Sequence, residues 1–283
     1  MKLALGTAQF GLTYGIANKS GQVSPDDIAQ ILDIARAAGV VTLDTAVAYG
    51  QAEVRLGQAG IAGFEVVTKL PHLIAGNRVE ATVAESLARL RIDKLRAVML
   101  HRSSDLLDVG GATVFRSLAK LREAGVIRKI GVSIYDPGEL AAVLARYELD
   151  LVQAPYNVLD RRLASTGWLT QLDGRGIEVH TRSAFLQGLL VMPPGERPMS
   201  FAPWSSKLAL WDRFVASTGL PAINAALAFA CGNKAVSRVV VGIDSPQQLR
   251  EILSAYKMPT STPSDELASD DLRLINPSNW NSL

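Results

Sequence analysis

The chain has 283 residues, of which 48% are hydrophobic and 20% are charged. This composition is typical of a soluble globular protein with a full core, and it excludes a disordered, fibrous or disulfide-dependent chain. Lys and Arg number 29 and Asp and Glu 27, so the net charge of +2 gives no reason to expect a nucleic-acid partner. The single cysteine predicts a reducing, cytoplasmic location. The apolar N-terminal run stops at Gly6, too short for a signal peptide, and no run approaches the roughly 18–20 apolar residues that span a membrane.

Eight short runs rich in β-branched and apolar residues recur along the chain. Several are apolar at consecutive positions, which is typical of parallel strands buried on both faces. The predicted strands cover residues 3–6, 40–46, 64–70, 97–102, 129–134, 151–157, 178–183 and 236–243.

The segments between these runs begin as helices do. Ser24 precedes Pro25 and two acids, which is an N-cap followed by proline in the first turn, and similar starts recur at Asp136 and Ser245. Residues 78–91 and 112–124 carry apolar side chains at helical spacing.

Strands that alternate with helices predict an α/β protein, and the count of eight favours a (β/α)8 TIM barrel over a doubly wound sheet. No linker divides the chain, so we expect one domain over residues 1–283. The spacing is irregular only before the eighth strand, where we expect an insertion at about 188–235. It contains a Pro-rich loop, 192–203, and helices over 204–217 and 221–231, and a short C-terminal tail covers 257–283.

Polar side chains end the second, third and fourth predicted strands: Asp44, Lys69 and His101. Tyr49 follows in the loop after Asp44, and the active site of such a barrel lies at these strand ends. A nearby ammonium stabilises a phenolate and lowers the tyrosine pKa, a carboxylate keeps the ammonium charged, and a histidine can hydrogen-bond a substrate oxygen. The group predicts a phenol that exchanges a proton near neutral pH. With three histidines in the chain, we expect no metal.

The segment Asp44–Gly50 (DTAVAYG), together with Thr68-Lys69-Leu70 and Leu100-His101-Arg102, resembles the aldo-keto reductase family. So do residues 131–133 (GVS) and 153–157 (QAPYN), and the resemblance runs from residue 3 to about 252. It implies the barrel fold and an NAD(P)(H)-dependent oxidoreductase that reduces a small aldehyde or ketone. In this interpretation Tyr49 is the general acid, Lys69 and Asp44 tune it, and His101 orients the carbonyl. We expect a monomer or weak homo-oligomer.

The cofactor site is also predicted by resemblance, because the chain has neither a strand–Gly-x-Gly-x-x-Gly–helix motif nor a P-loop. The dinucleotide would lie extended across the barrel mouth. Ser133 and Gln153 would hold the carboxamide, Gly188 would admit the pyrophosphate, and the turn at Gly242 would face the adenosine phosphate end. The predicted cofactor-binding residues are Gly6, Thr7, Asp44, Ser133, Gln153, Arg182, Ser183, Phe185, Gln187, Gly188, Gly242, Ile243, Asp244, Gln247 and Gln248.

The sequence departs from the family pattern at several positions. Ile134 stands where the family has Asn, Arg182 where an aromatic residue stacks on the nicotinamide, and Gln248 where Arg is common. The acid Asp244 in the same turn is unfavourable for the 2′-phosphate of NADP, so the choice between NADP(H) and NAD(H) stays open. Two alternative functions remain: a non-catalytic NAD(P)(H)-binding regulator that kept the fold, and a Schiff-base lyase with Lys69 as nucleophile.

Overall fold

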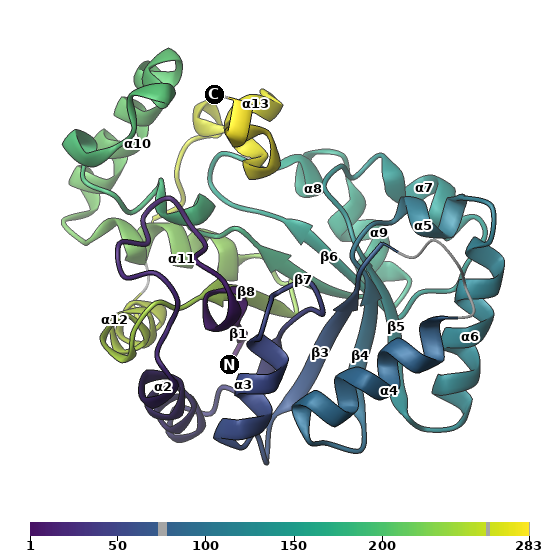
Figure 1. The fold of residues 1–283 in the computed structure, drawn as a ribbon. Helices are drawn as coiled ribbons and strands as arrows, with labels where there is room; N and C mark the ends of the chain where they lie inside the picture. Colours follow the sequence, from purple (N-terminus) through teal and green to yellow (C-terminus); the bar gives the residue numbers. More distant parts are fainter. Residues whose placement is uncertain (73–77, 259–260, 283) are drawn as a thin grey trace.

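The computed structural model describes residues 1–72, 78–258 and 261–282, and its centre is a closed barrel of eight parallel strands, β1 to β8 in sequence order (Figure 1). The barrel closes between the first and last strands, where Gly6 pairs with Gly242. This confirms the predicted (β/α)8 barrel. The strands are β1 Leu3–Gly6, β2 Thr42–Asp44, β3 Glu65–Leu70, β4 Leu95–Leu100, β5 Ile127–Ser133, β6 Leu151–Pro155, β7 Glu178–Arg182 and β8 Arg238–Gly242.

The predicted helix starts are present. In α2 (Pro25–Ala37) the Ser24 hydroxyl accepts a hydrogen bond from the backbone N–H of Asp27, and in α12 (Pro246–Tyr256) Ser245 does the same for Gln248. The start predicted at Asp136 is two residues early, because the N-cap of α7 (Glu139–Leu144) is Gly138 and Asp136 accepts from the N–H of Gly138 in the preceding turn. The other helices before β8 are α1 Ala8–Gly11, α3 Ala52–Ala59, α4 Val79–Leu90, α5 Ser104–Leu107, α6 Gly111–Glu123, α8 Arg162–Ser165, α9 Trp168–Gly174, α10 Ser205–Thr218 and α11 Ala222–Gly232.

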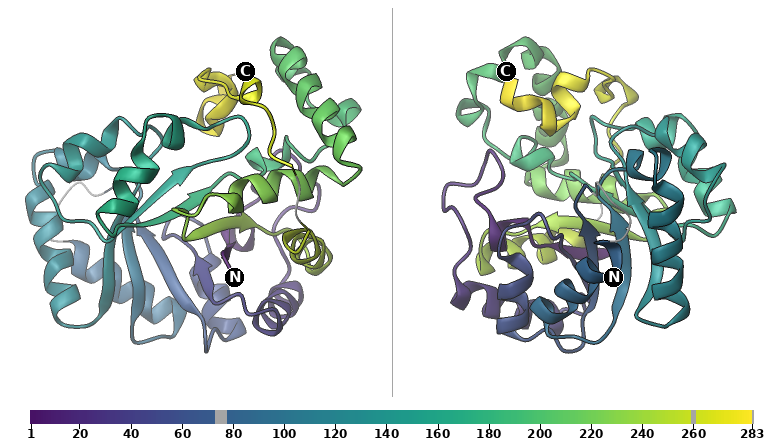
Figure 2. Two further views of the ribbon diagram at one scale, coloured as in Figure 1. Left: turned by 180° about the vertical axis from the view of Figure 1, so that it is seen from behind. Right: turned by 45° about the vertical axis from the view of Figure 1, so that its right-hand side comes forward.

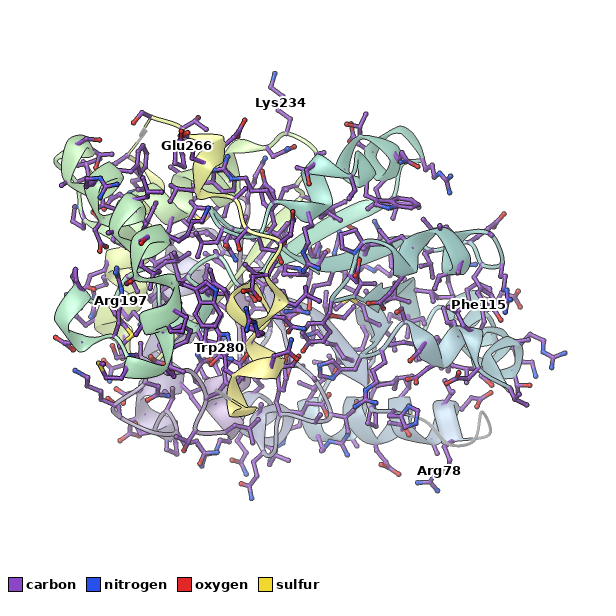
Figure 3. All side chains as sticks on the ribbon, turned by 90° about the horizontal axis from the view of Figure 1, so that it is seen from above. Arg78, Phe115, Arg197, Lys234, Glu266 and Trp280 are labelled. Carbon is purple, nitrogen blue, oxygen red and sulfur yellow. The ribbon has the colours of Figure 1, made fainter. Side chains whose placement is uncertain are left out.

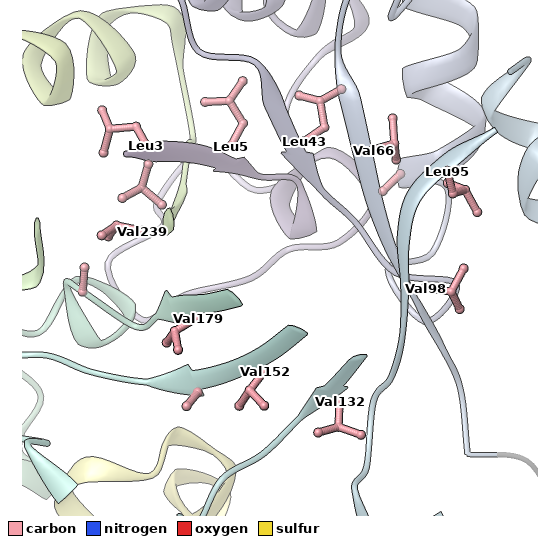
Figure 4. Packing of buried hydrophobic residues seen from close by; sticks show 14 of the residues in the cluster. Leu3, Leu5, Leu43, Val66, Leu95, Val98, Val132, Val152, Val179 and Val239 are labelled. Carbon is pink, nitrogen blue, oxygen red and sulfur yellow. The ribbon is translucent and has the colours of Figure 1, made fainter. Parts of the chain in front are cut away.

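The main apolar core lies between the barrel and its helices. Alternate strand residues such as Leu43, Val98 and Val179 belong to it and are fully buried, and Figure 4 labels these three among others around the ring of strands. A second, small cluster, which includes Val67 and Met99, forms separately from this layer. Successive strand residues point to opposite faces, so one cluster packs against the helices and the other lies inside the barrel. Polar side chains are then left to the ends of the strands.

The insertion before β8 builds its own apolar cluster with the C-terminal tail. Its short helices are η2 Leu186–Gly188, η3 Pro194–Glu196 and η4 Met199–Trp204, which lead into α10, and the tail adds η5 Asp265–Leu267, α13 Leu272–Ile275 and η6 Pro277–Ser282. Trp211 is fully buried there and donates to the Leu190 carbonyl at 2.8 Å. Figures 1 and 2 show the tail beside α10, and Trp204 donates to Asp271 across this contact.

Seen from above, Trp280 and Arg197 lie on the half of the molecule formed by the insertion, and Phe115 lies on the opposite half (Figure 3). The Trp280 ring packs edge-on against Phe201 with centroids 4.9 Å apart. Within the described residues no single helix is long and apolar enough to span a membrane, although Met199–Thr218 and Ala222–Gly232, bent by 96°, would pass together on length and composition.

Candidate active site

A buried ion pair lies at the C-terminal ends of β2 and β3. The Nζ of Lys69 donates to Oδ1 of Asp44 at 2.5 Å and to the Thr45 carbonyl at 3.0 Å. Gln153, from β6, donates its Nε2 to the second carboxylate oxygen of Asp44 at 2.7 Å. All three side chains are at most 2% exposed. A charge this deep is stable only when paired and hydrogen-bonded, and each of these groups has such partners.

Tyr49 and His101 lie above this pair. The Tyr49 ring centroid is 5.1 Å from Nζ of Lys69, and the rings of Tyr49 and His101 meet edge-on with centroids 6.0 Å apart. Tyr49 is held by a turn whose next residue, Gly50, has a φ of +56°. A Cβ at Gly50 would lie 2.5 Å from the Gly11 carbonyl oxygen. Glycine in this motif therefore sets the position of the tyrosine.

The protonation states follow from burial and charge. Burial raises the pKa of Tyr49 above its ordinary value, although the charge of Lys69 opposes the shift. Burial is the largest single effect on the pKa of Lys69 and lowers it, but the charges of Asp44 and Tyr49 and the hydrogen bonds to both together raise it above its ordinary value. Burial and the nearby cations Lys69 and Arg182 lower the pKa of His101 to about 4. At pH 7 the phenol is neutral, the ammonium charged and the imidazole neutral.

The expected phenol that titrates near neutral pH is therefore wrong for this structure. The prediction counted the stabilising ammonium but not the burial of the ring, which is the larger effect. It also counted Asp44 only as the group that keeps Lys69 charged, whereas the negative charge of Asp44 itself raises the pKa of Tyr49. A neutral Tyr49 suits a proton donor.

A cavity of about 390 Å³ opens over Tyr49 and extends across the barrel mouth. It brings together most of the predicted site. Predicted residues that line it are Gly6, Thr7, Asp44, Tyr49, His101, Ser133, Gln153, Arg182, Ser183, Phe185, Gln187, Gly188, Gly242, Asp244 and Gln248. Lys69 lies beneath it, against Asp44 and the Tyr49 ring.

Two predicted cofactor-binding residues lie away from the cavity. Ile243 is fully buried in the main apolar core. Gln247 is exposed on α12 and donates to Glu251 at 2.9 Å, one turn further along the same helix. Strand-like alternation directs Gly242 and Asp244 to the cavity and Ile243 to the core. In α12 the neighbours Gln247 and Gln248 lie on different faces of the helix, and Gln248 faces the cavity.

The wall formed by the segment after β1 was not predicted. Gln9, Tyr14 and Asn18 line the cavity from this segment, and the Ala17 N–H donates to the Gln187 carbonyl opposite at 3.3 Å. Gly188 has a φ of +96°, and a Cβ there would collide with Ala17. One sequence signal could have indicated this wall: Gln9 follows closely after the strand end at Gly6–Thr7.

The part of the cavity beside Gly242, at the end of β8, fits a ligand that donates hydrogen bonds. Oε1 of Gln9 and Oδ1 of Asp244 are buried acceptors without a partner in the described part of the chain. Gly242 lies beside them, and a Cβ there would come within 2.6 Å of the Gln9 side chain. Burial raises the pKa of Asp244, although hydrogen bonds from Gln248 and Gln9 lower it. Unpaired acceptors in a glycine-walled cleft suit the hydroxyls of a dinucleotide.

Arg182 lies at the Tyr49 end of the cavity and leans toward the segment after β5. Its Nη2 donates to the Ile134 carbonyl at 3.0 Å, and its guanidinium lies 4.2 Å from the centroid of the Tyr135 ring. Ile134 itself is fully buried, so it offers the site its backbone oxygen alone. Within the described residues, no three His, Cys, Asp or Glu side chains gather where they could hold a metal.

The fold and this site define a class: a (β/α)8 barrel with a buried Asp–Lys pair, a tyrosine and a histidine at the mouth. The sequence model of the Aldo/keto reductase family matches residues 2–268. The chain belongs to the aldo/keto reductase family, whose members are nicotinamide-dependent oxidoreductases of small carbonyl compounds.

Similar proteins agree with this assignment. A D-threo-aldose 1-dehydrogenase from Pseudomonas sp is 28% identical over 88% of this chain and 89% of its own length. An NADH-specific methylglyoxal reductase from Escherichia coli K12 is 28% identical over 64% of this chain and 60% of its own. The holo structure of an aldo-keto reductase from Bacillus halodurans has a TM-score of 0.76 at 22% identity, covering 94% of this chain and 89% of that one, which shows a common fold.

Proposed function

We propose that the protein reduces an aldehyde or ketone to an alcohol and that Tyr49 donates the proton. The observation that carries the proposal is the position of the Tyr49 ring at the cavity floor, 6.0 Å from the His101 ring and 5.1 Å from the Lys69 ammonium. A bound nicotinamide supplies the hydride to the carbonyl carbon. Residues that would hold the dinucleotide are Ser133, Gln153, Gln187, Gly188, Gly242, Asp244 and Gln248, all on the cavity wall.

The protein supplies the proton and the oxygen-binding groups. Tyr49 gives its phenol proton to the carbonyl oxygen, and its raised pKa keeps that proton in place until then. The phenolate that remains is stabilised by Lys69, which Asp44 keeps charged. His101, neutral above about pH 4, hydrogen-bonds the carbonyl oxygen beside the tyrosine.

We further propose that NAD(H) is preferred over NADP(H). Asp244 presents an unpaired carboxylate oxygen to the cavity beside Gln248. Arg182 is the one Lys or Arg side chain among the described lining residues, and it forms no ion pair with Asp244. A carboxylate without a cation repels a phosphate monoester but accepts from a ribose hydroxyl. The similar Escherichia coli protein is an NADH-specific reductase, which supports the same choice.

The Schiff-base alternative receives no support from the geometry. A nucleophilic lysine must lose its proton, whereas Asp44 raises the pKa of Lys69 and the side chain is 1% exposed. The other alternative, a non-catalytic NAD(P)(H)-binding regulator, would bind the same cofactor but would not reduce a carbonyl substrate. A single-domain, monomeric or weakly oligomeric, cytoplasmic protein stays a prediction from the sequence.

Two measurements on the intact protein test the proposal. Fluorescence titration with NADH and NADPH in parallel gives the two dissociation constants, and a panel of aldehydes and ketones is then assayed with the tighter cofactor. We expect NADH to bind at least about tenfold more tightly and at least one aldehyde to be reduced. Binding without turnover across the panel would support the regulator, and no binding of either dinucleotide would reject both.

A further inference from the structure

Arg182 is a charged group that the protein leaves without a counter-ion. Within the described residues no Asp or Glu oxygen lies within 4.0 Å of its guanidinium. Its neighbour Arg162 shows the contrast, because that guanidinium lies 2.9 Å from Asp160 and 4.0 Å from Asp136. A cation partly withdrawn from water normally has such a partner.

Most of the hydrogen-bonding capacity of Arg182 is also unused. Its Nη2 donates to the Ile134 carbonyl at 3.0 Å, and its Nη1 donates to the Ser183 hydroxyl at the long distance of 3.4 Å. A guanidinium has five N–H donors in a planar fork that matches a carboxylate. The Tyr135 ring, 4.2 Å away, covers one face and fixes the plane of the fork.

The charges around Tyr49 leave this cation uncompensated. Asp44 is neutralised by Lys69 at 2.5 Å, and His101 is uncharged at pH 7. Arg182 lines the same cavity as Tyr49 and His101, and its positive charge lowers the pKa of both. The other lining acid, Asp244, belongs to the β8 end, whereas the guanidinium is tied to the segment after β5.

From these observations we infer that Arg182 selects carbonyl substrates that carry a carboxylate, and that it holds this group while the carbonyl oxygen meets Tyr49 and His101. The inference rests on the proposed carbonyl reduction. It assigns a specificity residue to the reaction and names the substrate class as oxo acids. The pairing would supply the counter-ion that the protein omits.

A matched pair of aldehydes tests the inference. 4-Carboxybenzaldehyde and methyl 4-formylbenzoate share the reacting group and differ in the anionic charge. We expect kcat/KM for the acid to exceed that for the ester by about tenfold to a hundredfold, the range of a hydrogen-bonded charge pair. In Arg182→Gln this ratio falls by at least about tenfold, mainly through KM for the acid, and Arg182→Lys gives an intermediate ratio because the point charge remains without the fork.

Arg175→Gln is the matched control, since Arg175 is exposed before β7, loses the same charge and does not line the cavity. Its acid-to-ester ratio should equal that of the wild type. Calorimetric titration of the NADH-loaded wild type with benzoate and benzamide needs no variant and no turnover. Benzoate should bind at least about tenfold more tightly.

Equal kcat/KM for acid and ester in the wild type would overturn the inference and leave the proposed reduction intact. So would a preference that survives in Arg182→Gln, or a Kd for NADH that rises about tenfold in this variant while the ratio is unchanged, because Arg182 would then serve the cofactor phosphates. Equal binding of benzoate and benzamide would also overturn it. Failure of the wild type to reduce any aldehyde would reject the proposed function itself, and the inference with it.

Discussion

The ammonium of Lys69 lies 2.5 Å from one carboxylate oxygen of Asp44, and the Gln153 amide donates to the other oxygen at 2.7 Å. The carboxylate is thus held from both sides at the bottom of the cavity. Burial raises the pKa of Tyr49, and the negative charge of Asp44 opposes the lowering effect of Lys69. The phenol therefore keeps its proton. The pair stabilises the ionised phenol after proton transfer rather than ionising it beforehand.

The buried pair predicts a strong energetic coupling. Lys69→Met leaves the Asp44 charge without its cation and should lower the free energy of unfolding by about 3–5 kcal/mol. Asp44→Asn should be similarly destabilising, but the double variant should lose less than the sum of the two because neither charge is then alone. Urea unfolding of the four proteins measures this cycle. Additive losses would show that the pair is not coupled.

The pH dependence of kcat/KM should lack a transition near 6.5. His101 has its pKa lowered to about 4, so its imidazole stays neutral and active as pH falls, and it becomes charged only near that value. The raised pKa of Tyr49 moves loss of the phenol proton to the alkaline side of its ordinary range. We therefore expect a flat profile of kcat/KM from about pH 5 to pH 9. An acid limb centred at 6.5 would contradict these protonation states.

Asp244 should determine the choice of dinucleotide. Asp244→Asn removes the charge that repels a 2′-phosphate, so the Kd for NADPH relative to NADH should fall by about tenfold. Glu251→Gln removes the same charge from the exposed side of α12, where it pairs with Gln247, and should leave the two constants as they are. Fluorescence titration measures both variants. An unchanged ratio of the two dissociation constants in Asp244→Asn would show that the 2′-phosphate of a bound NADPH does not lie beside Asp244.

The insertion and the barrel should unfold together. Trp211 is fully buried in the insertion cluster and hydrogen-bonds Leu190, so Trp211→Ala should cost about 3–5 kcal/mol. If the chain is one domain, the whole transition moves to lower temperature as a single step in calorimetry. A separate low-temperature transition, with the barrel transition unmoved, would show that the insertion folds on its own.

The sequence was sufficient for the fold and for placing the proposed catalytic residues at one barrel mouth, because both depend on local patterns. Consecutive apolar runs mark buried strands, and Asp44, Lys69 and His101 come at their ends. Strand bounds were less accurate: the second strand was predicted over 40–46 and covers Thr42–Asp44. Past the end of β2, the N–H groups of Thr45 and Val47 still donate hydrogen bonds to β3. The strand-like sequence pattern is therefore longer than the strand.

Properties that depend on several distant segments were not predictable. The Gln9 wall forms only when the segment after β1 meets the turn after β8, and the protonation of Tyr49 depends on how deeply the fold buries it. Arg182 was recognised as a departure from the family pattern, but its missing counter-ion is visible only when Ile134 and Tyr135 are placed beside it.

The measurement that tests the central claim most directly is turnover by Tyr49→Phe, which keeps the ring and removes only the phenol oxygen. The variant should bind NADH with the affinity of the wild type, measured by fluorescence titration, while its kcat for aldehyde reduction falls by at least about a hundredfold. Thermal unfolding confirms that the variant is folded. Turnover near the wild-type rate would contradict the claim that Tyr49 donates the proton.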